Sequence, residues 1–175
     1  MELCERGTLA DVLVSEGGQL TEQMARSFFR DMLLALEYLH SRNLVHQGVR
    51  PSKILVTADG HAKLSDFSLL NGFEGAKPTQ EIAFMSPELM VPSGTASCLK
   101  SFHAKSADVW AAGVTLYIML FTVPPFVGPP QEIRAQIMEA NLRIPTGCSL
   151  PLQATLQGVS STALTPLSLL IILLA

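Results

Sequence analysis

The pattern of apolar and polar positions predicts a mainly helical chain. After Thr21, apolar residues recur every three or four positions, which is the spacing of a helix with one buried face. These residues are Met24, Phe28, Met32, Leu36 and Leu39. Thr21 is placed to cap this helix, and Asn43 to end it. A shorter helix is predicted over residues 9–15, and the two glycines at residues 17 and 18 would end it.

A second strong helix is predicted from Ala107 to about Phe121. Ser106 would cap it and Asp108 would lie in its positive first turn. The segment is apolar on nearly all sides, so we expect it to be central and buried. A third helix, over residues 131–141, would open after two prolines and bury Ile133 and Ile137 on one face.

Three short apolar runs predict strands, at residues 44–46, 54–56 and 62–64. The last two are joined by five residues that contain Asp59-Gly60, a dipeptide typical of a tight hairpin turn. Residues 68–105 have the composition of loops. The fold class predicted from the pattern is therefore mainly α with short β-hairpins.

The charge and cysteine content of the chain indicate which kinds of partner and which cellular location to expect. The chain has 175 residues, enough for one domain, and 15 acidic against 12 basic side chains give a net charge of −3. Because no lysine or arginine cluster is present, we expect no nucleic acid partner. Three widely spaced cysteines form neither a disulfide framework nor a zinc site, which favours free thiols and a cytoplasmic location.

The last part of the chain differs in character from the rest. Arg143 is the last charged residue, and the final 32 residues carry no charge. The apolar run at residues 167–175 is shorter than the ~20 residues that a membrane-spanning helix needs, and the N-terminus does not resemble a signal peptide. We expect residues 146–175 to be an apolar tail of unrelated character. The alternatives are a core helix or strand and, least favoured, weak membrane contact.

Several segments together resemble the signature motifs of protein kinases. His46–Leu55 resembles the catalytic loop H-R-D-L-K-P-x-N-I-L, Asp66–Ser68 the D-F-G motif, and Ser86–Glu88 the A-P-E motif, in the family's order. The apolar helix with Asp108, and the Pro-Pro-Phe run at residues 124–126, resemble the family's central helix and the loop after it. The resemblance covers residues 1–145 and implies a partial kinase-like domain of the serine/threonine type.

By this resemblance the chain starts at the hinge between the two kinase lobes. It then corresponds to the C-terminal lobe. The N-lobe would be absent, and with it the Gly-rich loop and the phosphate-binding lysine. Glu2 and Cys4 would offer backbone groups to adenine, and Leu55 would lie under the ring or simply pack in the core. We therefore expect no cofactor, and ATP with Mg²⁺ only if a longer form supplies the N-lobe.

The catalytic loop is degenerate where the chemistry would occur. Gly48 stands at the position of the catalytic aspartate, Gln47 at the preceding arginine, and Arg50 at the lysine two residues on. Lys53 stands at the asparagine that would hold a second metal ion, and a charged ammonium cannot ligate Mg²⁺. Asp66 keeps the carboxylate of a vestigial metal site. We expect no catalytic residues and no enzyme activity in this chain.

Two further expectations follow from the aligned positions. His46 matches a family histidine that is structural, packing below the aromatic residue at Phe67. Lys53 and Asp66 would form an ion pair in place of Mg²⁺ if both face the old metal site, and the alternative is that Lys53 points to solvent.

The sequence thus predicts a pseudokinase that acts through protein binding, with a partner such as an active kinase. One alternative is a fragment or isoform of a longer serine/threonine kinase-like protein that binds ATP. The other is an unstable truncated product without function.

Overall fold

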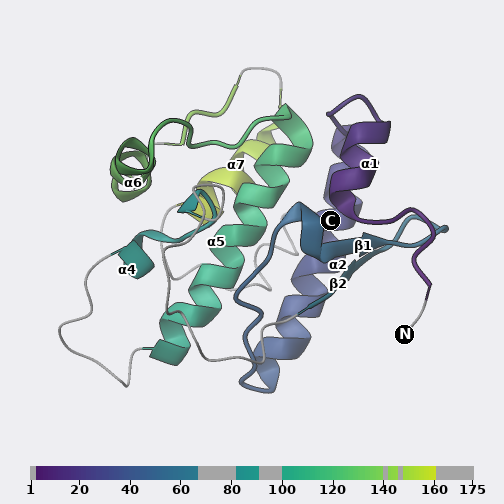
Figure 1. The fold of residues 1–175 in the computed structure, drawn as a ribbon, viewed down its shortest axis with the longest axis horizontal. Helices are drawn as coiled ribbons and strands as arrows, with labels where there is room; N and C mark the ends of the chain where they lie inside the picture. Colours follow the sequence, from purple (N-terminus) through teal and green to yellow (C-terminus); the bar gives the residue numbers. More distant parts are fainter. Residues whose placement is uncertain (1–2, 67–81, 91–99, 140–141, 146–147, 161–175) are drawn as a thin grey trace.

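Two long helices lie side by side through the middle of the molecule, α2 over Glu22–Ser41 and α5 over Lys100–Phe121 (Figure 1). The structure, a computed structural model, describes residues 3–66, 82–90, 100–139, 142–145 and 148–160. In this part of the chain most residues with regular structure are helical, and the strands form one two-stranded sheet. The mainly helical class predicted from the pattern is therefore confirmed, while its restriction to a C-terminal lobe stays a prediction.

The helix predicted after Thr21 is confirmed as α2. The Thr21 side chain accepts a hydrogen bond from the backbone N–H of Met24 at 3.3 Å, which satisfies one free donor of the first turn. Four of the five residues predicted for the apolar face are buried in the core, together with Ala25, Phe29 and Leu33, and Met24 is partly buried beside them. The shorter helix, α1 over Leu9–Ser15, is also confirmed, and Thr8 caps it.

Helix α5 is central and buried as predicted, but it begins earlier than the pattern indicated. It starts at Lys100, so Ser106 lies within the helix and does not cap it, and Asp108 lies beyond the first turn. Residues 100–106 are mostly polar and carry no apolar periodicity. Tertiary contacts stabilise this extension, because the Lys105 ammonium donates to the His40 carbonyl oxygen at 2.8 Å and to the Asn43 side chain at 3.1 Å.

The predicted hairpin is present, whereas one predicted strand is not. Strand β1 (Ile54–Val56) pairs antiparallel with β2 (Ala62–Leu64), and Gly60 takes a positive φ of 83° in the connecting turn. Residues 44–46 form no strand. The backbone N–H of His46 donates to the Asp108 carboxylate on α5, so it is not available to a neighbouring strand.

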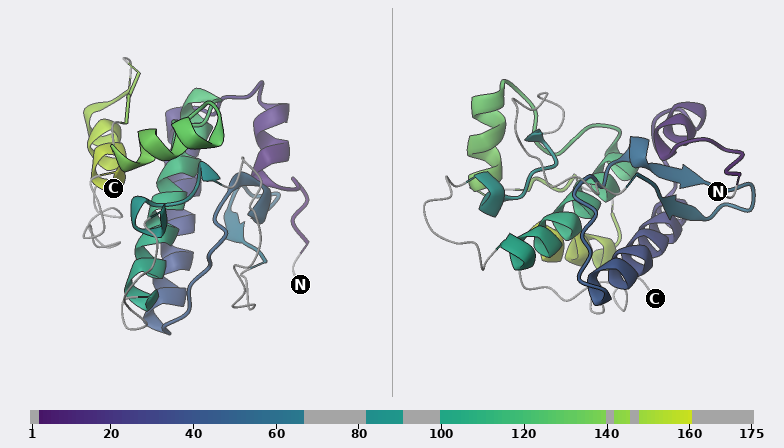
Figure 2. Two further views of the ribbon diagram at one scale, coloured as in Figure 1. Left: turned by 60° about the vertical axis from the view of Figure 1, so that its left-hand side comes forward. Right: turned by 60° about the horizontal axis from the view of Figure 1, so that its bottom comes forward.

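The remaining elements are short. They are η1 (a 3₁₀ turn, Pro51–Lys53), α4 (Pro87–Met90), α6 (Pro130–Met138) and α7 (Leu150–Ser160). Helix α6 packs beside α4 on the opposite side of α5 from the hairpin (Figures 1 and 2), with Ile133 and Ile137 buried as predicted. Helix α4 and the first turns of α5 fall in residues 68–105, which the composition assigned to loops.

Part of the segment expected to be an unrelated tail packs in the core. Residues 150–160 form α7, which lies against α5 and buries Leu152 and Leu156 completely or nearly so, at 0% and 1% exposed. The core-helix alternative therefore describes these eleven residues. Residues 161–175 lie outside the described part. No helix among the described residues is long and apolar enough to cross a bilayer.

The role of α7 is tested by Leu156→Ala. We expect this substitution to lower the free energy of unfolding by about 2–5 kcal/mol, because it opens a cavity between α7 and α5. The matched control is Leu150→Ala, since Leu150 is 79% exposed on the same helix and its loss should cost about 0.5 kcal/mol or less. Urea denaturation of both variants measures the difference, and equal effects would contradict a core role for α7.

Candidate functional site

A buried carboxylate on α5 holds the segment that resembles a catalytic loop. Asp108 is 1% exposed, and its two oxygens accept the backbone N–H groups of His46 and Gln47, each at 2.7 Å. The same carboxylate lies 2.9 Å from Nε2 of His40, near the end of α2. These bonds offset the cost of burying the charge and fix the loop to both long helices.

His46 has a structural place in this loop. Its side chain is fully buried, and Nε2 lies 3.1 Å from the carbonyl oxygen of Ser65. A carbonyl only accepts, so Nε2 carries the hydrogen and donates. Burial lowers the pKa of this imidazole, against a smaller opposing effect of the Asp108 charge, and so favours the neutral ring. Phe67, under which His46 was expected to pack, lies outside the described residues.

Two residues of the site have left-handed backbone conformations. Gln47 has φ of 60° and Asp66 has φ of 54°, values that cost free energy for residues other than glycine. The N–H of Gln47 is bonded to Asp108, and the side chain of Asp66 is bonded to Lys53. Tertiary contacts therefore hold both conformations in place.

Lys53 and Asp66 form the predicted ion pair. Nζ of Lys53 lies 2.6 Å from Oδ2 of Asp66, and the alternative, in which Lys53 points to solvent, is wrong. The backbone brings them together, because the N–H of Ser65 donates to the Lys53 carbonyl at 2.9 Å. The pair is partly exposed, with side chains 30% and 65% accessible, and the hydrogen bond from Lys53 lowers the pKa of Asp66.

The backbone and the described surroundings of Gly48 do not require a glycine. Among the described residues, a Cβ atom at this position would meet the ring of His46, at 3.8 Å from Nδ1, which is an ordinary van der Waals contact. The backbone there needs no glycine, because its φ is not positive. Gln47 and Arg50 on either side are half-buried.

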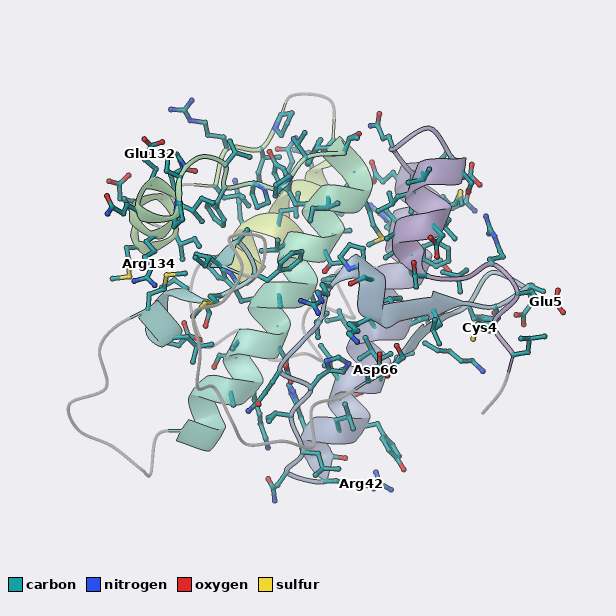
Figure 3. All side chains as sticks on the ribbon, viewed as in Figure 1. Cys4, Glu5, Arg42, Asp66, Glu132 and Arg134 are labelled. Carbon is teal, nitrogen blue, oxygen red and sulfur yellow. The ribbon has the colours of Figure 1, made fainter. Side chains whose placement is uncertain are left out.

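The residues expected around adenine lie near the hairpin. The chain after Cys4 runs beside β1, where the N–H of Arg6 donates to Val56 and the N–H of Val56 donates to Gly7. Leu55 is half-buried and its two strand neighbours are fully buried, so it faces away from the core. Figure 3 labels Cys4 at the outer end of the hairpin and Asp66 beside α2. Glu2 lies outside the described residues, and the adenine site stays a prediction.

Sequence reasoning missed the part that Asp108 plays. It assigned this carboxylate to a helix first turn, whereas the structure uses it to bind a loop 61 and 62 residues away in sequence. The signal available was a single acidic residue in a helix that is otherwise apolar on nearly all sides. Among the described residues no group of three histidine, cysteine or acidic side chains is arranged to hold a metal ion.

Comparison with known proteins agrees with the resemblance to protein kinases that the sequence motifs show. A family model described as the protein kinase domain matches residues 1–170, which extends beyond the boundary predicted at 145. The chain is 31% identical over 146 residues to serine/threonine-protein kinase AtPK1/AtPK6 of Arabidopsis thaliana, covering 81% of this chain and 30% of that protein. It is 35% identical over 144 residues to serine/threonine-protein kinase GRIK1 of the same plant, covering 81% and 36%. The chain thus spans about a third of these relatives.

The anchoring role of Asp108 predicts a large loss of stability in Asp108→Ala. We expect the free energy of unfolding to fall by about 3 kcal/mol, because two backbone donors lose a charged acceptor and remain buried. Glu139→Ala, at an exposed position after α6, is the control and should change it by about 0.5 kcal/mol or less. Chemical denaturation measures both values. Similar small effects would mean that the loop is held by other contacts.

The Lys53–Asp66 pair predicts a shift in the titration of Asp66. Lys53→Met should raise the pKa of Asp66 towards its ordinary value, since both the hydrogen bond and the positive charge are lost. The depressed pKa stabilises the fold above the ordinary pKa, and this contribution is lost as pH falls through the depressed value. NMR titration measures the change. Asp59 is an internal control because a hydrogen bond from Thr57, not Lys53, lowers its pKa.

Proposed function

Since the chain belongs to the protein kinase domain family, we propose that it is a catalytically inactive kinase-like module that acts by binding other proteins. The observation that carries this proposal is the contact of 2.6 Å between the Lys53 ammonium and the Asp66 carboxylate. The pair engages the one metal-binding carboxylate that the sequence retains.

Transfer of a phosphoryl group depends on a small set of positioned groups. A carboxylate orients the attacking hydroxyl and accepts its proton, and metal ions neutralise the phosphate oxygens. Gly48 has no side chain to accept a proton, and in the described part of the chain the ring of His46 is its side-chain neighbour. His46 is no substitute base, because its Nε2 is bonded to the Ser65 carbonyl and the side chain is fully buried.

The residues present do not fit the metal ions that the family uses. A magnesium ion needs oxygen ligands in octahedral geometry, and Asp66 alone offers a carboxylate at the aligned positions. The ammonium of Lys53 is a donor only and carries the same sign of charge as the metal. It therefore competes with a cation for Asp66, and no step of the proposed function passes through a bound metal.

The backbone contacts that hold the loop, in contrast, are present although the groups for phosphoryl transfer are not. Asp108 holds the backbone of His46 and Gln47, and the Ser65 backbone is bonded to Lys53. A domain that keeps these contacts while lacking a base presents a stable kinase-like surface. This supports a role in binding a protein such as an active kinase, which is the role that the resemblance to inactive kinase-like modules implies.

A second candidate is a piece of a longer serine/threonine kinase-like protein that binds ATP. The observation that favours it is coverage, because relatives match most of this chain while the chain spans only 30% and 36% of two of them. A rise in the unfolding temperature with ATP and Mg²⁺ would favour this candidate, since a ligand that binds only the folded state stabilises it. The proposal of an inactive module predicts no rise with Mg²⁺ alone.

The inactivity is tested by phosphate transfer from radiolabelled ATP in Mg²⁺ to serine- and threonine-containing peptides. We expect no label above a protein-free blank for the wild type and the same for Asp66→Asn, the matched control. Transfer by the wild type that Asp66→Asn abolishes would overturn the proposal. Calorimetric titration against active kinases of the family tests the binding half, and the absence of heat with all of them would contradict that choice of partner.

A further inference from the structure

Helix α2 has a second, exposed face opposite the core. With about 100° between successive residues, seven exposed side chains fall in a band along the helix side that faces away from the buried residues. We call this band the α2 outer stripe. Its members are Gln23, Ser27, Arg30, Leu34, Glu37, Tyr38 and Ser41. At its centre Leu34 is 45% exposed, and one turn later Tyr38 is 58% exposed.

The charges of the α2 outer stripe are arranged about its centre. Arg30 lies four residues before Leu34 and Glu37 three residues after it, at about 6 and 4.5 Å along the axis. Helical geometry places both on the same lateral edge of the stripe, at about 40° and 60° from Leu34. Among the described residues neither Arg30 nor Glu37 makes an ion pair.

This arrangement is complementary to a copy of itself. A two-fold axis that passes between the two Leu34 side chains, perpendicular to the helices and to the line joining them, makes the α2 helices antiparallel and keeps each lateral edge on its own side. Arg30 of one chain then lies opposite Glu37 of the second copy, and the reverse pair forms by symmetry. Leu34 packs on Leu34 of the second copy. In a two-fold parallel arrangement the two lateral edges exchange, so Arg30 and Glu37 of one chain would face the Tyr38 edge of the second copy and the two Arg30–Glu37 pairs would not form.

The other edge of the stripe is already ordered by contacts within the chain. The Arg42 guanidinium lies 3.8 Å from the centre of the Tyr38 ring. Asp31 accepts from His61 and from the backbone N–H of Ala62, so its charge is engaged by the turn of the hairpin. The ring of Tyr38 is thus held in place beside Leu34, and less side-chain freedom is lost when a partner covers it.

We propose that the α2 outer stripe is a self-association surface through which two copies of this chain form an antiparallel, two-fold symmetric dimer. One helix face buries less area than the ~1,200–2,000 Å² of a stable interface, so the dimer is weak and reversible. The inference goes beyond the proposed function and does not depend on it, since α2 packs the same way whether or not the chain transfers phosphate. It gives the chain a way to present two kinase-like surfaces together.

The experiment is sedimentation velocity of the full chain from micromolar to near-millimolar concentration. We expect the mass of the wild type to rise from 18.9 kDa towards twice that value. Arg30→Glu alone and Glu37→Arg alone should each weaken the dimer at least about tenfold, because each places like charges opposite each other. An equimolar mixture of the two variants should associate again, since acidic residues 30 and 37 of one then face basic residues 37 and 30 of the other.

Leu34→Lys should be monomeric, and Val14→Lys is its matched control, because Val14 is 80% exposed on α1 and outside the stripe. Thermal unfolding of each variant shows that it is folded. The proposal is overturned if the wild type stays monomeric throughout, if the charge variants associate as the wild type does, or if their mixture does not associate.

Discussion

The described structure depends most on one buried carboxylate, that of Asp108. It accepts the N–H groups of His46 and Gln47 and contacts His40, so a single side chain on α5 joins the end of α2 to the loop that follows. These backbone donors lie in a segment that pairs with no strand, and buried donors need an acceptor. A charged acceptor at 2.7 Å satisfies two of them at once, and this offsets the cost of burying the charge.

The contacts that hold the loop are separate from the groups that would perform chemistry on it. The anchor uses backbone N–H groups, which every residue except proline supplies, so these two bonds to Asp108 do not depend on the side chains of the loop. The anchor therefore does not depend on which side chains stand at positions 48 and 53. The Lys53–Asp66 contact places an ammonium beside the Asp66 carboxylate, and an ammonium supplies no oxygen ligand.

Helix α2 shows how one element can serve the interior and the surface. Its seven buried residues face α5 and the hairpin, and they account for its position in the fold. Its opposite face carries apolar and charged side chains whose order along the helix is self-complementary. A proposed dimer through this face and a proposed inactive site use different parts of the chain, because the loop that contains Gly48 is anchored to α5 by Asp108.

The sequence by itself determined α1, α2, the hairpin and the buried character of α5, because caps, turns and apolar periodicity are local signals. It also gives the residues at positions 48 and 53, and by resemblance to the family these stand where a catalytic aspartate and a metal-binding asparagine are expected, which stays a prediction. Tertiary structure alone decided that α5 begins at Lys100, that residues 44–46 form no strand, and that Leu156 belongs to the core. These features depend on contacts between residues distant in sequence, such as Lys105 with His40 and Asp108 with His46. A local sequence pattern carries no information about such contacts.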